Sequence, residues 1–84
     1  MRKKHETILQ DIFDSPVKSN VKWKDIESLF IALGGSVSEG KGSRVKVYLK
    51  DTVAVFHRPH PKKETDKGAL VSVRRFLEEV GIKP

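Results

Sequence analysis

The chain has 84 residues, of which 37% are hydrophobic, and it carries a formal net charge of +6 and no cysteine. This length allows one small domain with a thin core. The lack of cysteine excludes disulfides and thiolate metal sites, and no apolar run approaches the roughly 20 residues of a membrane-spanning helix. The positive charge favours an anionic partner, of which nucleic acid is the commonest.

A short helix is predicted over residues 3 to 14, because its apolar side chains recur at helical spacing. It ends before Pro16, since the residue preceding a proline avoids the helical region. Three turns of helix are marginal alone, so we expect it to pack on the rest of the chain or to contact a partner. No apolar segment follows the basic start, which predicts no secretory signal and a cytoplasmic protein. The stripe comprises Ile8, Leu9, Ile12 and Phe13.

A second, more strongly patterned helix is predicted over about residues 22 to 33, after a connector. Gly34 and Gly35 end it, because glycine supplies the left-handed conformation at which helices commonly stop. Trp23 is a candidate for base stacking, but its place on the apolar stripe favours a role as a core anchor. The stripe comprises Trp23, Ile26, Leu29, Phe30 and Leu33.

Three strands are predicted next, over about residues 36–39, 43–50 and 53–57. Side chains alternate across a strand, so the second strand has one apolar face and one face with cations and an aromatic ring. The links between the strands are short, which predicts hairpins and an antiparallel meander. The apolar positions are Val45, Val47 and Leu49, and the others are Arg44, Lys46, Tyr48 and Lys50.

The last predicted helix begins near Thr65 or Asp66, either of which can cap it, and runs to about Val80 before Gly81. Helices segregated from an antiparallel sheet pack on one of its faces and leave the other to solvent. The predicted fold class is therefore α+β, a two-layer domain in the order α-α-β-β-β-α, with the helices on one face of a three-stranded antiparallel meander.

Short motifs along this framework occur in a recognisable order. They are Ile26 to Gly35, Gly42-Ser43 before the second strand, Pro59-His60 after the third, Lys67-Gly68-Ala69-Leu70, and Phe76 to Gly81. In this order and spacing the chain resembles the HicA family of bacterial toxins, small ribonucleases of type II toxin–antitoxin modules. The resemblance covers a HicA-like domain over residues 21 to 84 and leaves residues 1 to 20 as an N-terminal helix and connector.

The resemblance implies a fold similar to the double-stranded-RNA-binding domain and an mRNA interferase, an endonuclease that cleaves mRNA without a metal ion or other cofactor. It also implies a HicB-like antitoxin partner, no membrane association, and a monomer when free or a hetero-oligomer with the antitoxin.

One departure from the family pattern bears on catalysis. The family's catalytic histidine follows Gly-Ser, and this position is Arg44 here. Histidine suits acid–base work because its unperturbed pKa, about 6.5, lies near the operating pH. Arginine stays protonated and cannot be a general base, although it can bind a phosphate or stabilise developing charge. Either another histidine does the chemistry, or the chain binds RNA without cutting it.

The candidate catalytic residues are His60 and His57, and the prolines on both sides of His60 fix the backbone there. We expect no metal site, because only Glu64 and Asp66 lie nearby as further ligands. A basic face suffices for double-stranded RNA, which is read mostly by shape, phosphates and 2′-hydroxyls, and a tyrosine can stack on an unpaired base. The candidate RNA-binding residues are Lys41, Arg44, Lys46, Tyr48, Arg58, Lys62, Lys63 and Lys67.

Three functions therefore remain open. The first is a toxin that binds and cleaves RNA and is held inactive by its antitoxin. The second is a non-catalytic RNA-binding module on the same scaffold, whose binding weakens steeply with salt and yields no product. The third is a protein-interaction domain whose first helix and basic face contact an acidic partner and which would bind any polyanion as well as RNA.

Overall fold

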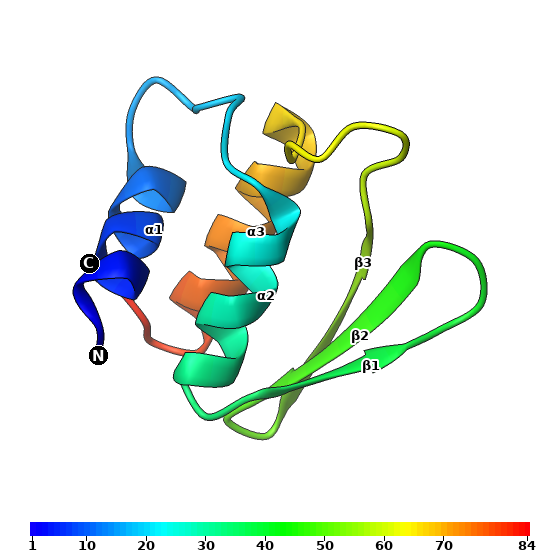
Figure 1. The fold of residues 1–84 in the computed structure, drawn as a ribbon. Coiled ribbons are helices and arrows are strands. Elements are labelled where there is room, and N and C mark those ends of the chain that lie inside the picture. Colours follow the sequence, from blue (N-terminus) through cyan, green and yellow to red (C-terminus); the bar gives the residue numbers. More distant parts are fainter.

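Three helices and three strands follow each other in the predicted order in the computed structural model, which describes residues 1–84. Helices α2 and α3 cover one face of the sheet, and α1 packs against both helices on the side away from the sheet (Figure 1). The α+β fold class is thus confirmed, with every element end within two residues of the predicted one. The elements are α1 (Lys3–Phe13), α2 (Trp23–Ala32), β1 (Ser36–Glu39), β2 (Arg44–Leu49), β3 (Thr52–His57) and α3 (Lys67–Glu79).

Four aromatic rings join the helical layer to the sheet. Phe56 of β3 lies at their centre, with its ring centroid 5.7 Å from that of Trp23 and 5.9 Å from those of Phe30 and Phe76. Aromatic pairs at such distances stabilise a core beyond the area that they bury. Trp23 is 5% exposed, so its predicted role as a core anchor is confirmed.

The N-terminal helix shares this core and is tied to α3 by one arginine. Its apolar stripe is buried with those of α2 and α3. The guanidinium of Arg74 donates hydrogen bonds to the carbonyl oxygens of Ile12, at 2.9 Å, and Asp14, at 2.7 Å. It also lies 5.8 Å from the ring centre of Phe13. Carbonyl groups at the end of α1 that lack helical partners are therefore satisfied by α3.

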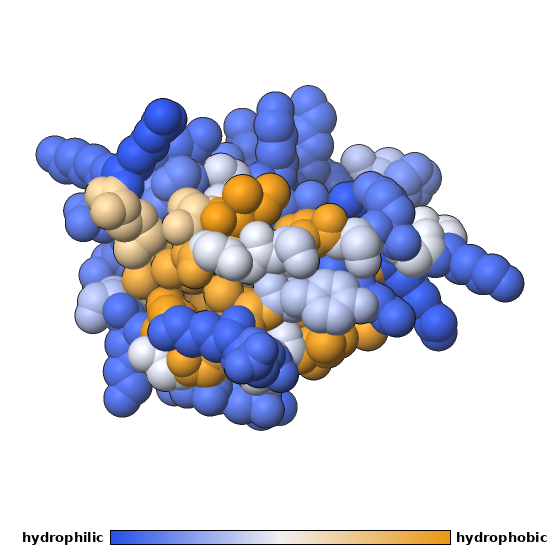
Figure 2. All heavy atoms as spheres, turned by 90° about the horizontal axis from the view of Figure 1, so that it is seen from below, coloured by the Kyte–Doolittle hydropathy of each residue, from blue (hydrophilic) through white to orange (hydrophobic).

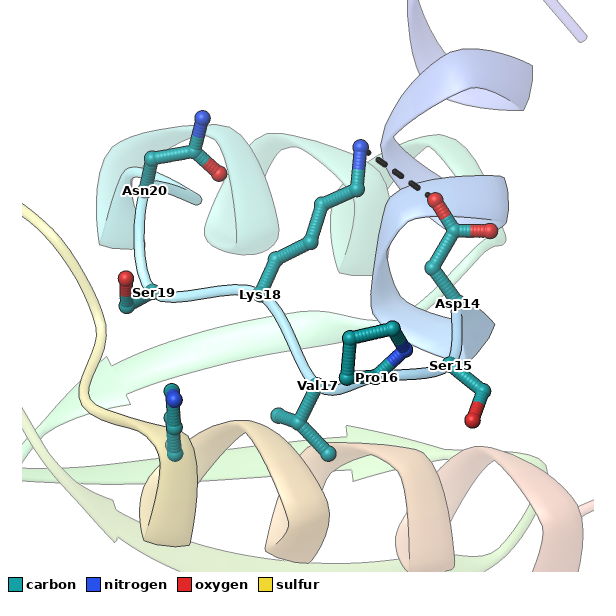
Figure 3. Close-up of a pocket in the computed structure, with 8 residues that line it drawn as sticks. Asp14, Ser15, Pro16, Val17, Lys18, Ser19 and Asn20 are labelled. Carbon is teal, nitrogen blue, oxygen red and sulfur yellow. Dashed lines mark ion pairs between the residues drawn. The ribbon is translucent and has the colours of Figure 1, made fainter.

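The connector after α1 arches over a shallow hollow of about 450 Å³ (Figure 3). Within it, the Nζ atom of Lys18 lies 3.0 Å from a carboxylate oxygen of Asp11 and 3.2 Å from one of Asp14. Hydrogen bonds from Lys18 to Asp11 and then Asp14 raise the pKa of Lys18 above its ordinary value. The lysine therefore holds the connector against the end of α1.

The sheet has the order β1-β2-β3, with both neighbouring pairs antiparallel. The β2–β3 turn is formed by Lys50 and Asp51, whose φ angles are 49° and 63°. Positive φ at both central residues is the mark of the tight hairpin turn whose twist matches its strands. The predicted link at residues 51 and 52 is therefore shifted by one residue, and β3 begins at Thr52.

Most of the surface is hydrophilic, but apolar side chains gather in the middle of the face shown in Figure 2. Apolar surface rimmed by polar residues is typical of contact sites. No helix is both long and apolar enough to cross a bilayer. The large hydrophobic residues that remain exposed are Met1, Ile31, Tyr48, Val53 and Val55.

Candidate functional site

The outer face of the sheet, which the helices leave open, carries Arg44, Lys46 and Tyr48 of the predicted RNA-binding residues and the candidate histidine His57. Directly opposite residues of an antiparallel pair lie on the same face, with Cβ atoms about 4.5–5.5 Å apart. Three such pairs between β2 and β3 are exposed, so cations, a histidine and an aromatic ring share one surface with two valines. The pairs are Arg44 with His57, Lys46 with Val55, and Tyr48 with Val53.

Arg44 is held at the start of β2 by a tight turn. The amide of Gly40 donates to the carbonyl oxygen of Arg44 at 2.8 Å, and the amide of Arg44 donates to the carbonyl oxygen of Lys41 at 3.2 Å. A Cβ atom at Gly40 would lie 3.0 Å from the Cβ atom of Arg44, so a larger residue there would displace Arg44 by a few tenths of an ångström. No carboxylate pairs with the Arg44 guanidinium within 4.0 Å. Its charge is therefore free for an anion, opposite His57.

Arg58 has a different environment. Its guanidinium donates to both carboxylate oxygens of Glu27 on α2, at 2.8 and 3.3 Å, and to a carboxylate oxygen of Glu39 on β1. The indole N–H of Trp23 also donates to Glu27. The hydrogen bonds to Glu27, and then the one to Glu39, raise the pKa of Arg58 above its ordinary value. One cation thus faces two carboxylates, and Arg58 ties the end of β3 to α2 and β1 without offering a free positive charge.

The two candidate catalytic histidines line different hollows. His60 lies in a hollow of about 500 Å³ with Gly42, Ser43, Arg58 and Pro59. The amide of Arg58 donates to the carbonyl oxygen of Ser43 at 2.8 Å, which holds this loop beside the start of β2. His60 therefore shares a hollow with the Gly-Ser turn, and His57 pairs with Arg44, which follows that turn.

His57, on the outer sheet face, also lines a hollow of about 330 Å³ at the edge of β3 beside the start of α3. It shares this hollow with the exposed carboxylate of Asp66, whose side chain caps α3 by accepting from the amide of Ala69 at 2.7 Å. No three His, Asp or Glu side chains of the chain gather where they could hold a metal ion.

The other predicted lysines are spread over separate surfaces. Lys41 lies in the turn between β1 and β2, and Lys67, the first residue of α3, lines the hollow under the connector. Lys62 and Lys63 line a further hollow together with Lys22 and Lys24. Lys22 and Lys24 were not predicted as contacts, because in the sequence they flank Trp23 as ordinary solvent-facing charges at a helix start.

The fold and its surfaces together define a small basic α+β domain, with helices on one sheet face and free cations on the other. The family model described as the HicA toxin of bacterial toxin–antitoxin systems matches residues 23–82, so the chain belongs to this family. No curated protein and no solved structure matches the chain. The protein is thus a toxin of a toxin–antitoxin system, and its family implies an antitoxin partner. The match contains the whole sheet, α2 and α3, and leaves α1 outside.

Proposed function

We propose that this toxin binds RNA at the outer sheet face and its rim and cleaves it without a metal ion, with His60 as the general base. The observation that carries the proposal is the position of His60 in one hollow with Gly42 and Ser43. The HicA pattern places its catalytic histidine directly after these two residues. An imidazole from the loop after β3 would then serve where Arg44 replaces the histidine of β2.

The proposed chemistry assigns a task to each group. The His60 imidazole takes the proton of a ribose 2′-hydroxyl, and the 2′-oxygen forms a bond to the adjacent phosphorus. The bond from that phosphorus to the 5′-oxygen breaks, and the leaving oxygen takes a proton from water or from His57. Arg44 and Lys46 bind the phosphates and stabilise the charge that develops on them. Because DNA lacks the 2′-hydroxyl, it should not be cut.

The test is incubation of the purified protein with end-labelled structured RNA in EDTA at neutral pH, followed by a denaturing gel. We expect fragments from RNA and none from DNA of the same sequence. His60→Ala should slow cleavage at least about 100-fold, as for loss of a general base. The matched control is His5→Gln, because His5 lies on α1 and bonds to Ser28. Cleavage that persists in a His57→Ala/His60→Ala double variant would overturn the catalytic assignment.

A second function, RNA binding without cleavage, is favoured by Arg44 itself, since a permanently charged guanidinium cannot act as a base. The RNA would then be shifted but intact on a native gel, with an affinity that falls steeply as salt rises. In that case Arg44→His should introduce cleavage, because it restores the family pattern after Gly42-Ser43. Equal affinity for RNA and for any other polyanion would instead favour an acidic protein as the partner of the basic surface.

A further inference from the structure

A hollow lined mainly by cations lies between the start of α2 and the loop that follows β3. It has a volume of about 540 Å³, and its lining consists of five cations, two prolines and Trp23, without any carboxylate. Four of the cations are lysines, and we call this feature the lysine hollow. It is lined by Lys22, Lys24, Lys62 and Lys63.

Backbone hydrogen bonds hold the two sides of the lysine hollow together. The amide of Trp23 donates to the carbonyl oxygen of Lys63 at 3.1 Å, and the amide of Thr65 donates to that of Val21 at 2.7 Å. Between these bonds, Lys22 and Glu64 form an isolated antiparallel bridge. The four lysines are therefore brought together by the fold, although they come from two distant chain segments.

The four lysines of the lysine hollow have no ion-pair partner within the protein. None of its four lysines lies within 4.0 Å of a carboxylate oxygen, and all four are exposed. Its fifth cation, Arg58, is already paired with Glu27 and Glu39. Like charges gathered in a concave surface concentrate their field there and attract anions. A ligand that presents several negative charges in a row would relieve this repulsion most.

We propose that the lysine hollow binds the phosphate backbone of RNA beyond the reacting phosphate. This inference rests on the function proposed above. The lysine hollow and the hollow of His60 both border on Arg58 and Pro59. An RNA strand that passes His60 can thus continue over these two residues onto the lysines. Ammonium groups are compact point charges and suit phosphates that must be held without a fixed orientation. Such contacts set the register of the RNA without reading its sequence.

The experiment compares Lys22→Gln/Lys24→Gln with the control Lys3→Gln/Lys83→Gln, which removes the same charge elsewhere. These lysines are exposed and make neither ion pairs nor side-chain hydrogen bonds, and the control pair lies at the chain termini, away from the lysine hollow (Figure 1). The probe is an RNA with methylated 2′-hydroxyls, which cannot be cut by the proposed route. Its affinity is measured by fluorescence anisotropy over a series of salt concentrations.

We expect the Lys22/Lys24 variant to bind RNA at least about tenfold more weakly than the wild type at low salt. Its slope of log affinity against log salt should be smaller by about 1 to 2, because up to two phosphate contacts are lost. The control variant should keep the wild-type slope, and both should melt at the wild-type temperature.

Three results would overturn the inference, and they separate it from the function on which it rests. If the wild type binds RNA and the Lys22/Lys24 variant keeps its affinity and slope, the lysine hollow is not a phosphate site, while the proposed function stands. The same holds if this variant loses only the binding of an acidic protein. If the wild type binds no RNA at all, both proposals fail.

Discussion

Replacing Arg58 by glutamine should destabilise the fold, although the residue lies at the surface end of β3. The change removes two contacts to the Glu27 carboxylate and one to Glu39. Glu27 is 20% exposed, and the indole N–H of Trp23 would be its one remaining side-chain partner. The cost therefore comes mainly from a carboxylate left in a half-buried place.

The size of this effect follows from the exposure of each partner. A hydrogen bond to a charged group contributes about 1.5–3 kcal/mol, whereas an exposed ion pair contributes about 0.2–1 kcal/mol. The side chains of Arg58 and Glu39 are 32% and 68% exposed, so the Glu39 contact contributes as an exposed ion pair does. The Glu27 contacts contribute at the low end of the range for a hydrogen bond to a charged group. We expect a loss of about 2 kcal/mol. At about 4–8 °C per kcal/mol for a domain of this size, Tm should fall by about 8–16 °C.

The assay is urea and thermal unfolding followed by circular dichroism, with Arg44→Gln as the matched control. Arg44 pairs with no carboxylate, so its replacement should change stability by less than about 0.5 kcal/mol. A double-mutant cycle with Glu27→Gln should give a coupling energy of about 1 kcal/mol. If Arg58→Gln proves as stable as Arg44→Gln, the contacts of Arg58 with Glu27 and Glu39 are not stabilising and Arg58 is free to bind phosphate.

Three other predictions test the fold and the outer face. Gly35→Ala would place a Cβ atom 2.6 Å from the carbonyl oxygen of Tyr48, so its free energy of unfolding in urea should fall by about 1–3 kcal/mol. The control Gly68→Ala meets its nearest atom at 3.8 Å and should raise the free energy of unfolding by about 0.5–1 kcal/mol. A more stable Gly35→Ala than Gly68→Ala would contradict this account. Arg74→Gln removes both hydrogen bonds to the end of α1, so it should lower the free energy of unfolding by about 2 kcal/mol and speed hydrogen exchange in α1. The control Arg75→Gln, at the exposed neighbouring residue, should change neither measurement. Tyr48→Ser should weaken binding of single-stranded RNA by about 1–3 kcal/mol in anisotropy titrations, and Tyr48→Phe should not; equal losses would exclude stacking.

The sequence alone determined the local structure and the two faces of the sheet. The alternation along β2 predicted which side chains are buried, and Val45, Val47 and Leu49 are each at most 2% exposed. The apolar stripes predicted all three helices, and Asp66 caps α3 as its residue type suggested. These features are predictable because each depends on neighbours in the chain, through helical or strand periodicity and capping.

The tertiary structure alone decided which charges are free and which residues share a site. Arg58 and Arg44 are indistinguishable as sequence, yet one is paired with Glu27 and Glu39 and the other has no partner. Likewise, only the packing of α2 against the loop after β3 brings Lys22 and Lys63 into one hollow, and only the hydrogen bonding of that loop brings His60 beside Ser43. The physical reason is that a charged or polar side chain is as compatible with solvent as with a distant partner, so its contacts follow from how the elements pack.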